Sequence, residues 1–192
     1  ATAFRTPEVV RNVITRNIQS DSSGRISRTA LQETVGAVLE EQKSLSSIYA
    51  QFEPDGYDGQ DRYFTGGVEE HSSDEGTLEI YYYRDPEGKV HFSRTEDPAT
   101  KYLDSLNEFG IREAEWYLCS RDTRAPCIME PYDYEISEGY SELMTSLVVP
   151  ILDDGAFAGV VGVDINLSTL QRTISGVSKE LFDGMSRVTL IS

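Results

Sequence analysis

The chain has 192 residues, 39% of them apolar, and its 17 basic and 33 acidic residues give a net charge of −16. This length suits one domain with a core of its own, or one domain plus a fragment. So acidic a surface repels phosphate backbones and excludes nucleic-acid binding, whereas it attracts cations or simply keeps the chain in solution. No run approaches about 18 consecutive apolar residues, so no segment is expected to span a membrane.

Residues 1–52 are predicted to form a helical N-terminal arm. Apolar residues recur at helical spacing over Pro7–Gln19, and the polar run Ser20–Gly24 ends this helix. A second helix is predicted from Ser27 to about Ala50, again from apolar residues spaced by three and four. Such a stripe is a core face in most proteins, but it can also pair with the same stripe of a second copy of the chain.

Residues 51–77 are predicted to be a loop rich in Gly, Pro, Asp and Ser. Its aspartates suggest a calcium loop, but a helix–loop–helix calcium site counted from Asp55 needs glycine sixth and a carboxylate twelfth. Those positions are Gln60 and Gly66, so the motif fails. We therefore expect these acidic residues to form turns and to partner helix ends.

The remainder predicts an α+β fold, with an antiparallel sheet that carries helices on one face. The turn Arg84–Gly88 predicts a hairpin between two strands. A pocket is expected on the face of the sheet that carries no helices, beneath loops that cross this face. The expected strands are Leu78–Tyr83, Lys89–Ser93, Trp116–Leu118, Ile128–Tyr134, Leu143–Leu152, Phe157–Ile165 and Arg187–Ile191, and the expected helices are Pro98–Phe109 and Leu167–Leu181.

Cys119 and Cys127 are the two cysteines, and seven residues separate them. If the strand-like segments on either side form a hairpin, the two side chains face each other at a separation that a disulfide can close. So short a loop would contribute roughly 2–3 kcal/mol. The alternative is a pair of buried thiols in a cytosolic protein, but the acidic, extracellular character of the chain favours the disulfide.

Three segments resemble the extracytoplasmic double-Cache sensor domains of bacterial chemoreceptors, which have a PAS-like fold. The first segment is Tyr49–Asp61. The second consists of Glu130-Pro131-Tyr132 and the strand Leu143–Ile151, and the third is Gly159–Ile165. The resemblance implies that residues 53–182 are the membrane-distal ligand-binding module and that residues 183–192 begin a truncated membrane-proximal module. It also implies a periplasmic sensor whose parent protein, such as a methyl-accepting chemotaxis protein, spans the inner membrane.

The ends of the chain agree with this interpretation. The sequence starts at Ala1 without a signal sequence and stops in the apolar run Val188–Ile191. We therefore expect an excised piece of a larger receptor, able to form a homodimer through its N-terminal helices.

Asp164 is the leading candidate for a ligand-binding residue, because a carboxylate that ends an apolar strand has no packing role there. The alternative is a cap for the helix that follows. The resemblance implies that it holds a ligand ammonium and that Trp116 and Tyr117 line the pocket, although aromatic residues at such positions can equally be core.

Neighbouring strands supply further candidates. Tyr132 and Tyr134 share one face of their strand. Either Tyr82 or the pair Tyr81 and Tyr83 faces the pocket, and the resemblance favours Tyr82. Thr145 or Ser146 offers a hydroxyl group. The predicted ligand-binding residues are thus Asp164, Trp116, Tyr117, Tyr82, Tyr132, Tyr134 and Thr145.

The ligand is expected to be a small amine or an amino acid. Aromatic faces and a buried carboxylate suit an ammonium group. Amino-acid-sensing relatives carry an arginine two residues before the tryptophan, whereas Ala114 stands here between Glu113 and Glu115. This departure favours amines such as a polyamine or a quaternary amine, although Arg112 remains a substitute for the missing arginine.

Other functional classes find less support. No phosphate loop or dinucleotide fingerprint is present, and His71 and His91 accompany no nucleophile motif, so we predict no enzyme. Two cysteines and two distant histidines do not make a zinc shell, and we expect neither a metal nor a cofactor. An acidic adhesion or calcium module, and the sensor domain of a histidine kinase or cyclase, remain the alternatives.

Overall fold

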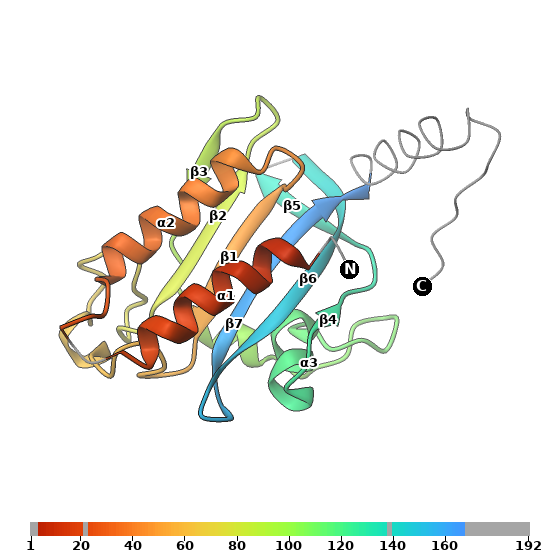
Figure 1. The fold of residues 1–192 in the computed structure, drawn as a ribbon. Coiled ribbons are helices and arrows are strands. Elements are labelled where there is room, and N and C mark those ends of the chain that lie inside the picture. The colour runs from red at the N-terminus through yellow and green to blue at the C-terminus, as the bar shows by residue number, and fades with distance from the viewer. Residues whose placement is uncertain (1–3, 21–22, 138–139, 168–192) are drawn as a thin grey trace.

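The computed structural model describes residues 4–20, 23–137 and 140–167, and within them it confirms the α+β fold. An antiparallel sheet has the strand order β3-β2-β1-β7-β6-β4, and β5 pairs with β6 off this path. Helices α1 and α2 lie across one face, while α3 lies on the other side near the end of β6 and β7 (Figure 1). The strands are β1 (Ser47–Phe52), β2 (Glu79–Arg84), β3 (Val90–Phe92), β4 (Cys127–Ile128), β5 (Tyr132–Ser137), β6 (Tyr140–Asp153) and β7 (Ala156–Asn166).

The two N-terminal helices form the main core with the sheet. α1 (Arg5–Ile18) and α2 (Arg28–Glu41) bury apolar residues at spacings of three and four against it. Ser27 caps α2 as its position predicts, because its hydroxyl oxygen accepts the backbone N–H of Ala30. The predicted apolar stripes are therefore core faces.

The second helix is shorter than predicted. It ends at Glu41, and residues 47–52, which were expected to complete the helical arm, form the strand β1 between β2 and β7. All six residues of β1 are buried. Ile48 and Tyr49 continue the spacing of three and four from Leu45, and for that reason the alternation along β1 was assigned to the helix.

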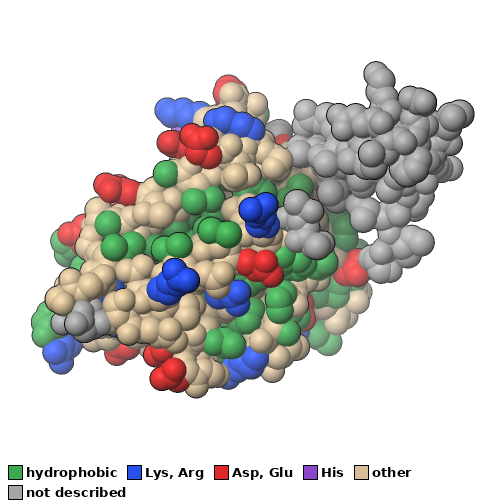
Figure 2. All heavy atoms as spheres, in the orientation of Figure 1, with side chains coloured by type: hydrophobic (Ala, Val, Ile, Leu, Met, Phe, Trp, Pro, Cys, Tyr) green, Lys and Arg blue, Asp and Glu red, His purple; other side chains and the backbone are tan. Residues whose placement is uncertain are grey.

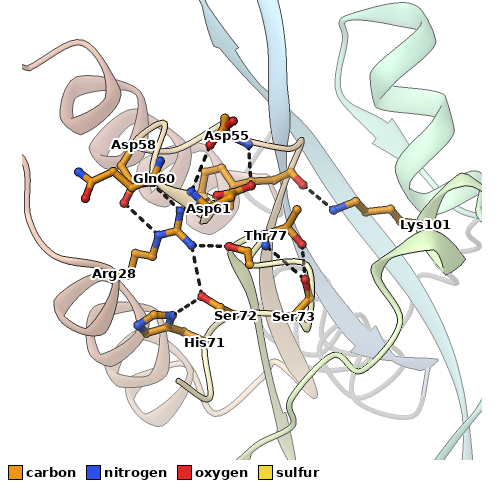
Figure 3. A network of polar contacts seen from close by, with 12 residues as sticks. Arg28, Asp55, Asp58, Gln60, Asp61, His71, Ser72, Ser73, Thr77 and Lys101 are labelled. Carbon is orange, nitrogen blue, oxygen red and sulfur yellow. Dashed lines mark hydrogen bonds and ion pairs between the residues drawn. The ribbon is translucent and has the colours of Figure 1, made fainter. Parts of the chain in front are cut away.

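The long loop after β1 is fastened to α2 by one arginine, which Figure 3 shows at the centre of a polar network. The Arg28 guanidinium forms two hydrogen bonds with Asp58 (2.5 and 2.9 Å) and one with Asp61 (2.6 Å). It also donates to the Gly76 carbonyl (2.7 Å) and the Ser72 hydroxyl (3.2 Å). Two acidic residues of the loop thus form ion pairs with the first residue of α2, and their negative charges stabilise the fold.

The segment around Trp116 differs from its predicted form. Instead of a strand it is the helix α3 (Glu115–Thr123), and the preceding helix shrinks to a 3-10 turn over Pro98–Tyr102 (η2). The predicted disulfide between Cys119 and Cys127 is confirmed, with a Cα–Cα distance of 6.3 Å. It joins α3 to β4 rather than two strands of a hairpin, so the pairing was right and the hairpin was wrong.

The disulfide is expected to stabilise the fold. Replacing both cysteines by alanine should lower the free energy of unfolding by about 2.5 kcal/mol, because the bond closes a short loop with a sequence separation of 8. Urea denaturation of the variant and of the parent, each with and without reductant, measures this. Reductant should destabilise only the parent, and an equal response of both proteins would contradict the prediction.

The predicted helix Leu167–Leu181 and the predicted strand Arg187–Ile191 lie largely outside the described residues, as does the proposed boundary at residue 183. The other predicted strands are confirmed within one to three residues at most ends, with β4 and β5 dividing the segment predicted as Ile128–Tyr134. None of the described helices is long and apolar enough to cross a membrane.

Candidate ligand-binding site

A buried carboxylate lies on the sheet face opposite α1 and α2. Asp164 of β7 pairs with Ser47 of β1 on one side and with Ser146 of β6 on the other. Because directly paired residues point to the same face, both serine hydroxyls reach the carboxylate and donate to it. The Tyr132 hydroxyl of β5 lies 3.4 Å from the same carboxylate and 2.7 Å from the Ser146 hydroxyl. Four strands therefore converge on one charged group.

The environment of Asp164 opposes its charge. The residue is only 3% exposed, and burial raises the pKa of its carboxyl group, while the hydrogen bonds from Ser146, Ser47 and Tyr132 act in the opposite direction. An ion without a cationic partner in so dry a place is costly. No Lys, Arg or His of the described residues forms an ion pair with Asp164, so a positively charged group brought to this carboxylate would supply a counter-charge.

Asp164 opens into a cavity of about 370 Å³ with aromatic walls. The Tyr49 ring meets the Trp116 ring edge to face at 5.3 Å, and Tyr81 lies 6.4 Å from Tyr49 on the next strand. The lining holds two carboxylates and no Lys, Arg or His among the described residues. The lining residues are Tyr49, Gln51, Tyr81, Ser93, Thr95, Thr100, Glu113, Trp116, Tyr132 and Asp164.

Three of the predicted site residues, Asp164, Trp116 and Tyr132, come together in this cavity. Tyr117 and Thr145 do not line it. The Tyr117 hydroxyl is held by Glu53 at 2.6 Å, and burial raises the pKa of that hydroxyl above its usual range.

The Thr145 hydroxyl donates to the Met129 carbonyl (2.6 Å), while its neighbour Ser146 points to Asp164. The side chain of Tyr134 is outside the described part of the structure.

Tyr82 lies on the opposite face from the cavity. Its ring packs against the main core beside α2, where a Cβ added to Gly36 would meet it at 2.8 Å. Tyr81 lines the cavity instead. The register decides this, since Glu79 pairs with Gln51 and side chains alternate along β2 from there. The expectation for Tyr82 is corrected accordingly.

Sequence reasoning missed three residues of β1 that contribute here, namely Ser47, Tyr49 and Gln51. They alternate with buried apolar residues, but the predicted helix concealed that period of two. Arg112, the considered substitute for a carboxylate-binding arginine, does not line this cavity. Its guanidinium is held by Glu115 (2.5 Å) and Asp122 (2.6 Å).

One wall of the cavity is pinned to the sheet by a buried ion pair. Lys101 of η2 follows the lining residue Thr100, and its ammonium donates to Glu79 and to the Phe52 carbonyl (2.5 Å). Figure 3 shows this side chain reaching across toward the strands. Both charged side chains are 1% exposed, and burial raises the pKa of Glu79 to about 7 despite the lysine beside it. The position of η2 in the cavity wall thus depends on an ion pair that is almost fully shielded from water.

Comparisons with known proteins show the family to which the chain is similar. The family model described as "Methyl-accepting chemotaxis protein-like, first PDC sensor domain" matches residues 31–172. The chain is 31% identical over 165 residues to the methyl-accepting chemotaxis protein TlpQ of Pseudomonas aeruginosa, covering 86% of this chain and 23% of that protein. It therefore spans less than a quarter of this curated relative.

Solved structures share the fold. The extracellular domain of mmHK1S-Z3, described as a histidine kinase, superposes with a TM-score of 0.65 at 24% identity, over 90% of this chain and 55% of the other. The ligand-binding domain of the Campylobacter jejuni chemoreceptor Tlp3, solved in complex with 4-methylisoleucine, gives a TM-score of 0.51 at 15% identity, over 91% and 54%.

Proposed function

The chain belongs to the family of methyl-accepting chemotaxis protein-like first PDC sensor domains, which are sensors and not enzymes, and from this premise we propose that it binds a small cationic amine in the Asp164 cavity. One observation carries the proposal. A buried, desolvated carboxylate faces aromatic rings in a cavity whose described lining contains no cationic side chain. An ammonium group satisfies the carboxylate and gains up to about 2 kcal/mol from a desolvated aromatic face.

An amino acid is the alternative ligand. The Tlp3 domain holds 4-methylisoleucine, and an amino acid would place its ammonium on Asp164 in the same way. Its carboxylate would then need donors, and the cavity offers only neutral ones, such as Gln51, Thr95 and Thr100, beside the carboxylate of Glu113. The repulsion between two carboxylates favours the amine without a carboxylate.

The parent protein is proposed to be a transmembrane receptor that exposes this domain to the periplasm. This chain covers 23% of TlpQ, so signalling across the membrane is proposed for a longer parent protein and not for this domain by itself. A histidine kinase remains the second candidate for the output, since mmHK1S-Z3 has the same fold. Ligand binding at Asp164 would couple the β5–β6 and β1–β7 pairs, which is one way for strand shifts to reach the N-terminal helices.

A homodimer through the N-terminal helices is proposed as well. Val9 and Val13 on α1 are 54% and 40% exposed, and apolar side chains are visible over the face of α1 and α2 (Figure 2). Val9 and Val13 lie four residues apart and therefore on the same side of α1, where they can face a partner helix. The whole receptor would add its own contacts to this face.

A thermal-shift screen of the chain against amines and amino acids tests the proposed function. A ligand at one hundred times its dissociation constant should contribute about 2.7 kcal/mol, which raises the melting temperature by a few degrees in a domain of this size. Shifts confined to amines support the favoured ligand, and shifts confined to amino acids support the alternative. Silence with both classes would reject the proposal.

The affinity for an amine should fall as the solution is acidified. Ammonium binding requires the ionised form of Asp164, whose pKa is raised in the empty site. The bound cation lowers that pKa. When the pH is below the pKa of the empty site, binding therefore releases a proton, and the affinity weakens as the pH falls through that pKa. Titration calorimetry in buffers of different ionisation enthalpy measures both effects. A constant affinity between about pH 8 and pH 4 would contradict this role of the carboxylate.

Replacing Gly162 by alanine should weaken ligand binding by about tenfold, because a Cβ there would overlap the Tyr49 ring and push it from its place in the cavity wall. Gly36→Ala is the matched control, since its Cβ would meet Tyr82 on the other face of the sheet. Calorimetry of both variants should show the loss only for Gly162→Ala. Equal affinities would mean that the position of Tyr49 does not matter.

A further inference from the structure

A second, larger cavity lies beside the first. This outer chamber measures about 810 Å³ and is lined by residues 107–113, 115–116, 119, 128–133 and 143. Three residues, Glu113, Trp116 and Tyr132, line both cavities. The Asp164 cavity and the outer chamber therefore adjoin at these three side chains.

The charged residues that line the outer chamber are mostly acidic. Arg112 is the sole cationic residue of its lining within the described structure, and Glu115 and Asp122 already hold the guanidinium. Glu113 and Glu130, by contrast, form no ion pair with any described residue. The chamber can thus accept a cation, whereas it has no cationic donor to spare for an anion.

The lining of the outer chamber also includes apolar side chains that are open to solvent. Phe109, Ile128 and Leu143 line the chamber and are 77%, 64% and 44% exposed. Contiguous exposed apolar side chains rimmed by polar ones mark binding surfaces in soluble proteins. Cys119 also lines the chamber, so the disulfide to Cys127 holds its floor in place without a ligand.

We propose that the outer chamber is the second half of the binding site and holds the far end of an elongated dication. The ligand is a terminal diamine whose first ammonium lies at Asp164 and whose second lies against Glu130 and Glu113. Its methylene chain crosses between Trp116 and Tyr132 over these apolar side chains. The inference rests on the proposed function, because it takes Asp164 as the first ammonium site. A compact amine fills the Asp164 cavity and leaves the outer chamber unused.

Calorimetric titration of the chain with butylamine, hexylamine and octylamine, each beside the corresponding terminal diamine, tests the proposal. Once the chain is long enough to reach the outer chamber, the diamine should bind about fivefold tighter than the monoamine, as exposed charge pairs allow. Glu130→Gln should remove most of that advantage. Glu87→Gln is the matched control, since it deletes the same charge at the exposed tip of the β2–β3 hairpin, and it should preserve the advantage.

The outcomes separate the two proposals. Equal affinities for monoamines and diamines at every length overturn the outer chamber and leave the amine sensor standing. So does an advantage that Glu87→Gln lowers as much as Glu130→Gln, because the overall negative field would then be its source. Binding of an amino acid without any amine overturns both the chamber and the favoured amine, and supports the alternative ligand. A chain that binds no member of either class loses both the chamber and the proposed function.

Discussion

Asp164→Asn is expected to reduce the affinity for a cationic amine by about 30- to 3,000-fold while leaving the unliganded protein as stable as before, or more stable. Truncating one partner of a buried charge pair costs about 2–5 kcal/mol of binding free energy, and each 1.4 kcal/mol is tenfold. The folded state, however, loses a desolvated charge whose pKa burial had raised. The amide keeps the shape and can still accept a serine hydroxyl.

Titration calorimetry with butylamine and a thermal melt of the free protein measure the two effects. Asp153→Asn provides the control, because it removes the same charge from the other end of the β6–β7 hairpin. Retained affinity in a folded Asp164→Asn protein would show that the amine binds elsewhere. A large loss of stability would instead show that the carboxylate is needed by the fold and would leave the site without its main anchor.

Lys101→Met is expected to lower the free energy of unfolding by about 3–5 kcal/mol, because it strands the Glu79 carboxylate in a place that is 1% exposed. The double variant Lys101→Met/Glu79→Leu should recover most of that loss, since two apolar residues of similar size need no counter-charge. Urea denaturation of the parent, both single variants and the double variant completes the cycle.

An exposed pair shows what an ordinary ion pair would give. Arg121 and Asp122 lie on the surface of α3, and Arg121→Met should cost less than about 1 kcal/mol. If Lys101→Met costs no more than that, water reaches the pair and the wall of the cavity is not pinned as described. If the double variant is stable but binds amines poorly, the pair positions η2 for the ligand rather than the fold.

The sequence predicted those elements whose signal is local. The long apolar strands β6 and β7 and the capped start of α2 were predicted near their observed bounds. By contrast, β1 was predicted as helix, because its neighbours β2 and β7 and the groups that cover its two faces lie outside the local sequence pattern. The same holds for α3, whose Trp116 and Tyr117 favour strands by propensity. Packing of Tyr117 and Leu118 into the second core decides for the helix.

The candidate site was predictable to the extent that single residues reveal their chemistry. Asp164 stood out because a carboxylate in an apolar strand needs a reason. The choice between Tyr81 and Tyr82 could not be made in that way, since one residue along a strand reverses the face and only the pairing partner fixes it. Ser47 and Tyr49 were missed because both belong to β1, whose pairing partners were unknown while it was predicted as helix. The sequence thus predicts cavity residues such as Asp164, Trp116 and Tyr132. It does not predict those whose position depends on the register of the strands.

Arg28 has a consequence for the order in which the chain folds. Its hydrogen bonds reach residues 30, 33, 44 and 48 positions away, on both sides of the loop between β1 and β2. None of these bonds can form locally, so the loop has only its own short-range hydrogen bonds before the helix docks. We expect amide exchange in this loop to be protected only when α2 is seated on the sheet, so that a single guanidinium makes the loop and the helix one cooperative unit.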